Sequence, residues 1–486
     1  MILSKIIDNI GTVEVKGDVR KEIASITSDS RKVEKGGLFI AVKGYASDGH
    51  AYIASAIEKG AVAVIYEEEG AACDVEGVTF IKVENSRHAV AIAAHNFFGK
   101  PSEKLTLVGI TGTNGKTTTV TLLYNLFMGL GYNCGLLSTI ANYVGTDKRE
   151  TDNTTSDPIT INSLLAEMVE EGCEYCFMEV SSIGVEQERV SGLRFKVGIF
   201  SNLTHDHLDY HKTFAEYLRC KKLFFDNLPS DAFAIINIDD KNGPVMVQNT
   251  VAKVITYACK RSADHTARIL EQSFEGMLLR IDGRETWSRL VGAHNAYNLL
   301  AIYTTAVCLG ADPEQVLVAL SSLRSAPGRL ETVRGPRDLS VVIDYAHTPD
   351  ALENVLKTLR DVAPERQLIC LFGCGGGRDK TKRPEMAQVA ARLADRLVVT
   401  SDNCRTEDPE AILNDIRTGL DWQGIAKALF ITDRREAIRT AILTAPEGAT
   451  ILLAGKGHED YQIIGHEKLH FDEKEIVAET FKLILK

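Results

Sequence analysis

The 486-residue sequence contains no long uncharged apolar stretch. No run reaches the roughly 18 uncharged apolar residues that a membrane-spanning helix needs. Acidic Asp8 also follows Met1 too closely to leave room for the apolar region of a secretion signal. We therefore expect a cytoplasmic protein that is not associated with a membrane.

Positive charge is also scarce. Lys and Arg number 55 against 66 Asp and Glu, which gives a formal net charge of −11. Proteins that bind nucleic acid or an anionic membrane through their general surface usually carry a basic patch. The charge balance therefore predicts no nucleic-acid partner, and any phosphate group must bind at a local site.

The sequence does not have the cysteine pattern of a disulfide-stabilised fold, because its 10 cysteines are spread over a long chain. Cys173 and Cys176 have the spacing of a metal or redox pair, but no second pair lies near them. They lead into the apolar run 175–178, which favours buried thiols over a metal or redox site.

The length exceeds what one hydrophobic core usually organises, and the composition, 44% hydrophobic and 25% charged, is typical of a globular protein. Apolar runs alternate with helical stretches, which predicts an α/β fold. We expect three domains: a small N-terminal α/β domain (1–103), a central P-loop parallel-sheet domain (104–327) and a C-terminal Rossmann-like doubly wound domain (328–486). The expected strands are 37–42, 61–65, 105–110, 175–180, 197–202, 234–238, 339–344, 367–372, 396–400, 428–431 and 450–454.

A glycine-rich segment, Gly112-Thr-Asn-Gly-Lys-Thr-Thr118, directly follows the expected strand 105–110. Its glycines allow backbone N–H groups to point at phosphate oxygens, its lysine can reach the outer phosphates, and the next threonine can offer a hydroxyl to Mg²⁺. Ile110 stands where the strict phosphate-loop pattern has its first glycine. The segment predicts ATP binding, and the alternative is an ordinary glycine turn before a helix.

Acidic and histidine residues follow two further expected strands. Glu179 ends an apolar run, so its carboxylate should lie at the carboxyl edge of the sheet, where ligands of α/β domains bind. Asp206-His-Leu-Asp-Tyr-His211 follows the next strand. Carboxylates beside a phosphate loop favour Mg²⁺ that bridges ATP phosphates. A zinc site and a solvated polar loop are the alternatives.

Polar segments also follow four expected strands of the third domain, at 344–349, 373–379, 401–405 and 455–459. Because the carboxyl ends of parallel strands share one edge, we expect these segments to line one crevice. The glycines of the second segment do not have the spacing of a dinucleotide-binding fingerprint.

The chain resembles the Mur ligases, a family that also includes the folylpolyglutamate synthetases, over its whole length. The resemblance rests on segments in the family's order: 112–118, Glu179-Val-Ser-Ser182, Asn202-Leu-Thr-His-Asp-His-Leu-Asp-Tyr-His211, Tyr217-x-x-x-Lys221 and Asn237-Ile-Asp-Asp240. It implies an ATP-dependent, carbon–nitrogen bond-forming ligase that joins an amino acid to a carboxylate through an acyl-phosphate during peptidoglycan precursor synthesis. A P-loop regulatory switch or binding module is the rival from another class.

The resemblance also implies which residues act. The catalytic residues would be Lys116, Lys221, His207 and Glu179, and Mg²⁺ would be held by Thr117, Glu179, His207 and Lys221, the last as a carbamate (N6-carboxylysine). ATP would contact Gly112, Thr113, Asn114, Gly115, Lys116, Thr117, Thr118, Asn295, Asn298, Arg329 and Asp344.

The implied substrates are UDP-MurNAc-L-Ala-D-Glu and an amino acid, and we expect a monomer. The first would bind Ser30, Asn153, Thr154, Thr155, Ser181, Gln187 and Arg189, and the second Arg378, Asp402, Asn403, Cys404, Arg405, Gly455 and Glu459. Two positions depart from the family pattern: Ile183 replaces a histidine and Cys404 replaces a proline.

The segment Asp402-Asn-Cys-Arg405 carries the specificity prediction. In the family, an arginine at this place accompanies meso-diaminopimelate, whose second amino-acid head has a carboxylate that a guanidinium can grip bidentately. Lysine ends in an ammonium, which an arginine repels. We therefore expect addition of meso-diaminopimelate, with an L-lysine-adding ligase or a folylpolyglutamate synthetase-type ligase as the alternatives.

Overall fold

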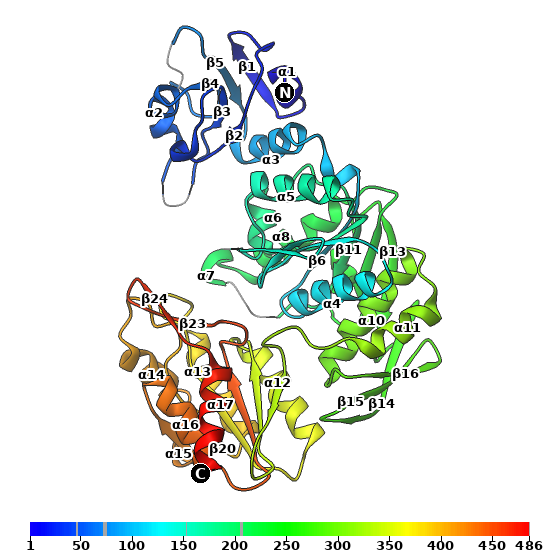
Figure 1. Ribbon diagram of the computed structural model, residues 1–486, viewed down its shortest axis with the longest axis vertical. Coiled ribbons are helices and arrows are strands. Elements are labelled where there is room, and N and C mark those ends of the chain that lie inside the picture. The colour runs from blue at the N-terminus through cyan, green and yellow to red at the C-terminus, as the bar shows by residue number, and fades with distance from the viewer. Residues whose placement is uncertain (45–46, 71–74, 152, 205–207, 486) are drawn as a thin grey trace.

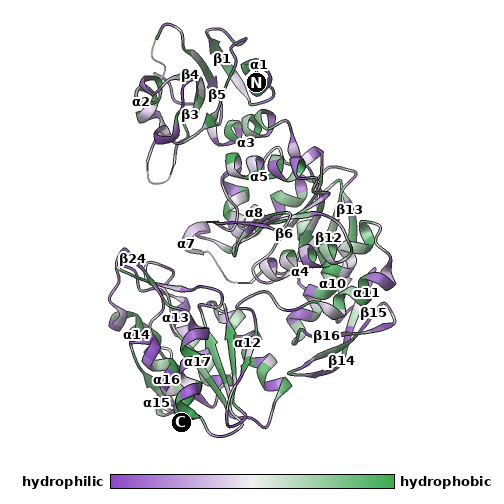
Figure 2. Ribbon diagram, viewed as in Figure 1, coloured by the Kyte–Doolittle hydropathy of each residue, from purple (hydrophilic) through white to green (hydrophobic). Residues whose placement is uncertain are grey.

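The computed structural model describes residues 1–485 except 45–46, 71–74, 152 and 205–207. The described chain forms three α/β regions that follow one another along the long axis of the molecule (Figure 1). Each contains its own sheet, and apolar residues concentrate in the strands and on the helix faces that cover them (Figure 2). Among the described helices, none is long and apolar enough to span a membrane.

The N-terminal region holds a sheet of order β1-β5-β4-β3-β2, in which β1 is antiparallel to β5. The elements are α1 (Leu3–Ile6), β1 (Thr12–Lys16), β2 (Ile26–Thr27), η1 (Ser30–Lys32), β3 (Gly37–Ile40), η2 (Gly49–Tyr52), α2 (Ile53–Glu58), β4 (Ala61–Tyr66), β5 (Thr79–Val83) and α3 (Ser86–Phe97). The Asn85 side chain accepts hydrogen bonds from the first turn of α3 and so begins this helix.

The central region holds a sheet of order β16-β15-β14-β13-β12-β11-β6-β10-β7-β8-β9. Its strands are β6 (Thr106–Thr111), β7 (Cys134–Leu137), β8 (Asn142–Val144), β9 (Asp147–Arg149), β10 (Tyr175–Glu179), β11 (Phe195–Phe200), β12 (Phe233–Asn237), β13 (Lys253–Ala258), β14 (His265–Ser273), β15 (Gly276–Ile281) and β16 (Arg284–Ser288). Its helices are η3 (Pro101–Glu103), α4 (Lys116–Gly129), α5 (Pro158–Glu170), α6 (Ser182–Glu186), α7 (Leu208–His211), α8 (Phe214–Asp226), α9 (Gly243–Met246), α10 (Ala293–Cys308) and α11 (Pro313–Ser322).

Alternate residues of the central strands bury into separate cores on the two faces of the sheet. Val108 and Ile110 of β6 pack in one core with α4, α10 and α11, whereas Leu107 belongs to the other core with α5 and α8. This is the two-residue period of a strand covered on both faces. His95 Nδ1 of α3 lies 3.1 Å from Asn162 Oδ1 of α5, which links the first region to the second.

The C-terminal region holds a sheet of order β17-β18-β22-β19-β20-β21, parallel except for β17, and a separate β23-β24 hairpin. Its strands are β17 (Glu331–Arg334), β18 (Ser340–Asp344), β19 (Leu368–Phe372), β20 (Arg396–Val399), β21 (Ala428–Phe430), β22 (Thr450–Ala454), β23 (Tyr461–Ile464) and β24 (Glu467–His470). Its helices are α12 (Pro349–Val362), α13 (Lys382–Leu393), α14 (Pro409–Arg417), α15 (Trp422–Ala426), α16 (Arg434–Leu443) and α17 (Glu473–Ile484), and they cover both faces of the sheet (Figure 1).

The α/β class is confirmed, and the strands expected from the sequence all have counterparts within a few residues. The exact domain boundaries stay predictions. The central sheet is more mixed than expected, because β15 and β16 at one edge and β8 and β9 at the other pair antiparallel with their neighbours. The turn between β15 and β16 is Asp282-Gly283, with φ of +46° and +83°, a pair that favours a tight hairpin.

Cys173 and Cys176 are free and buried, as the sequence predicts. Burial raises the pKa of both thiols, that of Cys176 well above its ordinary value. They are therefore core side chains of β10 and the turn before it.

Candidate active site

The phosphate loop joins β6 to α4 through glycines in conformations that other residues rarely adopt. Gly112 has φ of +152° and Gly115 has φ of +89°. A Cβ atom would lie 1.9 Å from Ser201 Oγ at Gly112 and 2.6 Å from Asn298 Oδ1 at Gly115. No side chain caps α4 among the described residues. The loop and the helix N-terminus therefore have the form of an anion-binding site.

Two lysine side chains meet at the carbonyl oxygens of this loop. Lys116 Nζ donates to the oxygens of Gly112 and Thr113, both at 2.9 Å. Lys221 Nζ of α8 donates to the same Gly112 oxygen at 2.8 Å and lies 4.7 Å from the centre of the Tyr217 ring. Lys221 is only 1% exposed. The structure thus brings the amine that was predicted to be modified against the predicted phosphate site.

Arg329 approaches the loop from the start of the C-terminal region. Its Nη2 lies 3.4 Å from Thr117 Oγ1, and its guanidinium stacks 4.7 Å above the Tyr345 ring. Its buried Nε has no hydrogen-bond partner among the described residues. A guanidinium has five donors, so Arg329 can hold an added anionic oxygen beside Thr117.

A cavity of about 360 Å³ lies between the central and C-terminal regions. The predicted ATP-binding residues that line it are Asn114, Gly115, Thr118, Asn295, Asn298, Arg329 and Asp344. Asp239, Asp240, Tyr297 and Asp350 line it as well. The cavity therefore joins the phosphate loop, the start of α10 and the third domain, segments far apart in the sequence.

Two carboxyl groups, the buried Asp344 and the half-buried Asp350, organise the wall of this cavity. Asp344 accepts hydrogen bonds from the backbone N–H of Leu330 at 2.7 Å and of Ala346 at 2.8 Å. Asp350 Oδ2 accepts from Asn114 Nδ2 at 2.7 Å and so joins α12 to the phosphate loop. Burial raises the pKa of both carboxyl groups above the ordinary aspartate value.

Glu179 lies at the carboxyl end of β10 and is 1% exposed. Its Oε1 accepts a hydrogen bond from the Thr139 backbone N–H at 2.9 Å. The Thr139 hydroxyl lies 3.1 Å from the same oxygen and 3.0 Å from Thr154 Oγ1. These contacts fix the orientation of the carboxylate and connect it to the segment predicted to bind the sugar-peptide substrate.

The rest of that predicted segment forms a connected group beside Glu179. Thr155 Oγ1 donates to the Glu179 carbonyl at 2.9 Å and accepts from the Ser181 N–H at 3.0 Å. Arg189 donates through Nη1 to the Thr155 carbonyl at 2.6 Å and through Nη2 to Gln187 Oε1 at 2.7 Å. Burial lowers the pKa of Arg189. The arrangement presents hydroxyls and a guanidinium that suit an anionic ligand.

Other predicted residues are placed differently. His207, the expected metal ligand, lies outside the described residues. So do His205 and Asp206, which together with His207, Asp209 and His211 carried the zinc alternative. Ser30 lies in η1 of the N-terminal region, where its carbonyl accepts from Lys59 Nζ at 2.9 Å. Asn153 is exposed, and Ile183 is half-buried in α6.

The Asp48-Gly-His50 segment has the residue types of a metal site, together with Glu68. However, His50 Nδ1 lies 2.6 Å from Asp48 Oδ1, and Nε2 accepts from the Glu67 and Glu68 backbone N–H groups at 3.1 and 3.4 Å. Both ring nitrogens are thus used in holding the loop, which explains the histidine without a metal.

The predicted amino-acid site lies at the carboxyl ends of β20 and β22. Asn403 Nδ2 donates to Glu459 Oε2 at 2.9 Å, and Lys456 Nζ lies 3.1 Å from Glu459 Oε2 and 3.6 Å from Asp402 Oδ1. A Cβ at Gly455 would lie 2.8 Å from Asp402 Oδ2. Burial raises the pKa of Asp402, but Arg434 and Lys456 lower it more, so the pKa falls below its ordinary value. Asp402 is therefore held in its ionised form.

Arg405 is held in a strained conformation by the β23-β24 hairpin. Its φ is +51°, unusual for a residue with a side chain. Its N–H donates to the Ile463 carbonyl at 3.1 Å, its carbonyl accepts from the Gly465 N–H at 2.7 Å, and its Nη1 donates to the Gly376 carbonyl at 2.9 Å. Cys404, which replaces the usual proline, is 4% exposed and packs in the core beneath the site.

Arg378 lies exposed on the loop after β19. A Cβ at Gly375 would lie 3.1 Å from Arg405 Nη1 and 3.8 Å from Arg378 Cγ. The loops that carry the two predicted cations therefore pass the same glycine.

Sequence reasoning did not single out Lys456, Asp350 or Thr139. Lys456 was visible within Gly455-Lys-Gly-His-Glu459, but its complete burial between two acidic residues comes from packing. Asp350 contacts a loop more than two hundred residues away, and no local pattern signals such a contact.

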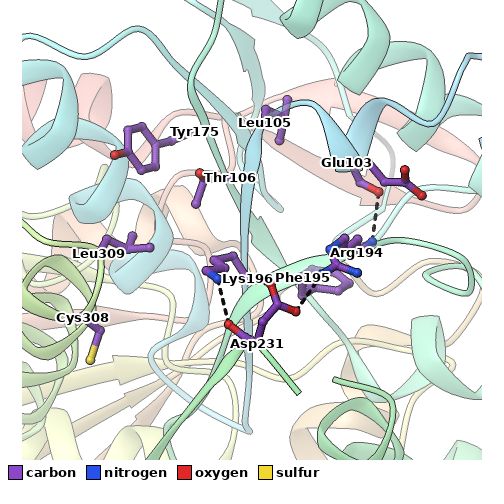
Figure 3. Close-up of a pocket in the computed structure, with 11 residues that line it drawn as sticks. Glu103, Leu105, Thr106, Tyr175, Arg194, Phe195, Lys196, Asp231, Cys308 and Leu309 are labelled. Carbon is purple, nitrogen blue, oxygen red and sulfur yellow. Dashed lines mark hydrogen bonds and ion pairs between the residues drawn. The ribbon is translucent and has the colours of Figure 1, made fainter. Parts of the chain in front are cut away.

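A second cavity, of about 320 Å³, lies where the central strands begin rather than where they end (Figure 3). Its cationic side chains, Arg194 and Lys196, both pair with Asp231, at 2.7 and 3.3 Å. Both cations are thus paired with a carboxylate of the same cavity. The cavity lies at the sheet edge opposite the phosphate loop, so it is not part of the candidate site.

Comparison with known proteins agrees with this arrangement. Residues 22–98 match the Mur ligase family catalytic domain, 110–306 the Mur ligase middle domain, and 328–457 the Mur ligase glutamate ligase domain. A UDP-N-acetylmuramoyl-L-alanyl-D-glutamate–2,6-diaminopimelate ligase of Bacteroides fragilis is 52% identical over 99% of this chain and 100% of its own. A protein of the same name from Clostridium acetobutylicum is 43% identical over 99% of each chain.

Solved structures give the same result. A UDP-N-acetylmuramoyl-L-alanyl-D-glutamate–2,6-diaminopimelate ligase structure matches with a TM-score of 0.71 and 32% identity over 99% of both chains. A Mycobacterium tuberculosis folylpolyglutamate synthase shares the fold, with a TM-score of 0.62 and 18% identity over 75% of this chain and 91% of its own. The chain therefore belongs to the Mur ligase family of ATP-dependent ligases.

Proposed function

We propose that this protein joins meso-diaminopimelate to UDP-N-acetylmuramoyl-L-alanyl-D-glutamate, with ATP hydrolysis, in peptidoglycan precursor synthesis. The observation that carries the amino-acid assignment is an acidic group, formed by Asp402 and Glu459 with the amide of Asn403, beside loops that carry Arg378 and Arg405. The acidic group can bind an ammonium and the guanidiniums a carboxylate, which together match the second amino-acid head of diaminopimelate.

The reaction begins with the γ-phosphate of ATP. A carboxylate is a poor electrophile, so phosphoryl transfer from ATP to the glutamate side-chain carboxylate forms an acyl-phosphate. The uncharged amine of diaminopimelate then attacks its carbonyl carbon, and phosphate leaves. Lys116, the phosphate-loop N–H groups and Arg329 can neutralise charge on the transferring group, as in phosphoryl transfer generally.

The residues around the phosphate loop fit a magnesium ion. Thr117 and the buried carboxylate of Glu179 are oxygen ligands of the kind that Mg²⁺ prefers, and His207 is proposed as a further ligand. When bound, Mg²⁺ would supply positive charge that offsets the negative charge of the ATP phosphates.

Lys221 is proposed to carry a carbamate formed with CO₂, which would give the long side chain a carboxylate in place of an ammonium. The carbamate nitrogen keeps one N–H, so the modified side chain can still donate to the Gly112 carbonyl that Lys221 contacts now. Lys221 is only 1% exposed, and burial of a charge is costly, so a modification that turns the ammonium into a ligand for a metal ion suits this position.

The sugar-peptide substrate is proposed to extend from Ser30 of the N-terminal region to the hydroxyl and guanidinium group around Thr155 and Arg189. Closure of the third domain over the cavity would exclude water from the acyl-phosphate. A monomer in the cytoplasm without nucleic-acid or membrane partners remains part of this proposal.

The function is tested by incubating the protein with ATP, Mg²⁺ and UDP-N-acetylmuramoyl-L-alanyl-D-glutamate against a panel of amino acids. We expect release of ADP and of a UDP-tripeptide only when all components and meso-diaminopimelate are present. Phosphate release that is independent of both acceptor and amino acid would instead indicate a nucleotide switch. Product formation with a folate and glutamate would indicate a folylpolyglutamate synthetase.

A further inference from the structure

The two cations proposed to bind the diaminopimelate carboxylate lie on loops that pack directly against each other. One loop follows β19 and carries Arg378, and the other follows β20 and carries Arg405. The Gly376 N–H donates to the Asn403 carbonyl at 2.9 Å, and a Cβ at Gly376 would lie 2.0 Å from the Cys404 oxygen. The backbones are therefore in contact, and a shift of one loop must move the other.

Glu407 connects these loops through its side chain. It lies on the second loop, where its N–H donates to the Cys404 carbonyl at 3.1 Å. Its Oε2 accepts from the backbone N–H of Gly377, the residue directly before Arg378, at 3.1 Å. Its Oε1 also lies 2.8 Å from Lys380 Nζ, on the far side of Arg378. The carboxylate thus grips the first loop on both sides of Arg378.

Arg383 of α13 binds both oxygens of this carboxylate. It lies in the first turns of α13 with its side chain 0% exposed, and Nη1 and Nη2 each donate to one oxygen of Glu407 at 2.8 Å. Nη2 also donates to the Gly375 carbonyl at 3.2 Å, and Nη1 to Asp415 at 2.8 Å. A buried guanidinium with a bidentate partner has a fixed geometry.

The carboxylate of Glu407 stays ionised at neutral pH, so its ion pairs with Arg383 and Lys380 persist there. The hydrogen bonds from Arg383 and then Lys380 hold the pKa of Glu407 far below the ordinary glutamate value. Glu407 faces these two cations, the Gly377 N–H and the loop backbone, while Asp415 shares Arg383 from α14. Neither Glu407 nor Arg383 has a role in the proposed catalytic steps.

We propose that Glu407, held by Arg383, is a positioning residue that sets Arg378 relative to Arg405 and so determines affinity for the second carboxylate of the amino-acid substrate. This inference rests on the proposed function. Glu407 acts through Arg378, so its loss should weaken diaminopimelate binding more than it slows the chemical step.

The test compares Glu407→Gln with Asp415→Asn, a matched control that removes a charge from the same Arg383 but does not touch the Arg378 loop. We expect Glu407→Gln to raise KM for meso-diaminopimelate about ten-fold, as expected for misplacing a binding group, with kcat and KM for ATP changed less than about two-fold. Asp415→Asn should leave all three constants within about two-fold of the wild type.

A double-mutant cycle with Arg378→Ala separates positioning from a purely structural role. In the Arg378→Ala background, Glu407→Gln should raise KM by no more than about two-fold, because the residue through which it acts is gone. Equal effects of Glu407→Gln in both backgrounds, or an unchanged KM in the single variant, overturn the inference. Glu407→Asp, which keeps the charge but is too short to reach both partners, gives the same test if Glu407→Gln does not fold.

The wild type and the Glu407→Gln variant together distinguish failure of the proposed function from failure of this inference. A wild type that does not use meso-diaminopimelate refutes the function, and this inference with it. A wild type that uses it, together with a Glu407→Gln variant of normal KM, refutes this inference alone.

Discussion

Single buried side chains determine how the phosphate loop can work. Lys221 lies 1% exposed with its amine 2.8 Å from the Gly112 carbonyl, on the same oxygen that Lys116 contacts. Two cations at one carbonyl suit a site that receives phosphates. The proposed carbamate would replace the positive charge of Lys221 with a negative one, so that the side chain could bind a metal ion instead of repelling it.

Lys221→Ala should lose at least about 10²-fold in kcat, by analogy with the loss of one preorganised charged group. Added short carboxylates such as formate or acetate should restore part of the activity, because they can occupy the place of the carbamate. Steady-state rates with and without the added acid measure this effect. Lys222→Ala is the control, since Lys222 is the next residue of α8 but pairs with Asp226 at 2.6 Å. Wild-type activity in Lys221→Ala would contradict the proposed role.

Stability should depend on pH through His294, which lines the ATP cavity. Burial, and then Arg329, lowers the pKa of His294 from 6.5 to about 4. Between these two pH values the unfolded chain binds a proton at His294 and the folded protein does not. The contribution of His294 to the free energy of unfolding is therefore complete above pH 6.5 and is lost as the pH falls toward 4.

His294→Gln should remove that dependence. Between pH 7.5 and pH 5, the wild type should lose about 1–2 kcal/mol more of unfolding free energy than the variant, seen as a steeper fall in Tm. Parallel Tm curves for the two proteins would show that His294 titrates normally.

The β23-β24 hairpin, an element that the sequence did not predict, holds Arg405 in place. Hairpin backbone groups at Ile463 and Gly465 bond to both backbone groups of Arg405, whose φ is +51°. Strain of this kind is kept where surrounding contacts fix a functional side chain.

Arg405→Ala should weaken transition-state stabilisation with meso-diaminopimelate by roughly 2–5 kcal/mol, the range for removing one partner of a desolvated charge pair. The measurement is kcat/KM, with Arg417→Ala as the control, because Arg417 stacks on Phe430 at 4.2 Å in another part of the region. A loss of the same size with both variants would point to general destabilisation rather than recognition.

The β-strands and the phosphate loop could be predicted because their signals are local. Apolar runs such as 367–372 and 450–454 became β19 and β22, and Gly112 lies where a Cβ has no space. The β14 and β16 strands were missed because they are half-exposed and lack a continuous apolar run. The Glu407–Arg383 contact was missed because it depends on how α13 packs under two loops, which no residue spacing indicates.

Across the whole molecule, the ATP cavity exists only where the central and C-terminal regions meet. Asn114 bonds to Asp350 on one side of this junction. On another side, Phe274 at the β14-β15 turn packs under the guanidiniums of Arg334 and Arg366, at 4.8 and 5.6 Å from its ring centre. These contacts help to hold the two regions in their relative position.

Phe274→Ala should weaken this junction by about 1 kcal/mol, the order of a cation–π contact, and so shift the closed fraction about five-fold. KM for ATP should rise by a similar factor, and X-ray scattering with an ATP analogue should show a less compact particle. Trp422→Ala is the control, because Trp422 is an aromatic residue 78% exposed elsewhere in the C-terminal region. An unchanged KM for ATP would exclude a role for Phe274 in closure.

We propose that the acidic group and the two arginines of the C-terminal region select meso-diaminopimelate. The test is a competition assay in which the wild type is incubated with equimolar meso-diaminopimelate and L-lysine, together with ATP, Mg²⁺ and UDP-N-acetylmuramoyl-L-alanyl-D-glutamate. The amounts of the two tripeptide products are then measured by mass spectrometry. We expect the diaminopimelate product to exceed the lysine product by at least about 10²-fold, since the half-buried guanidinium of Arg405 repels the lysine ammonium. Comparable amounts of the two products would contradict it.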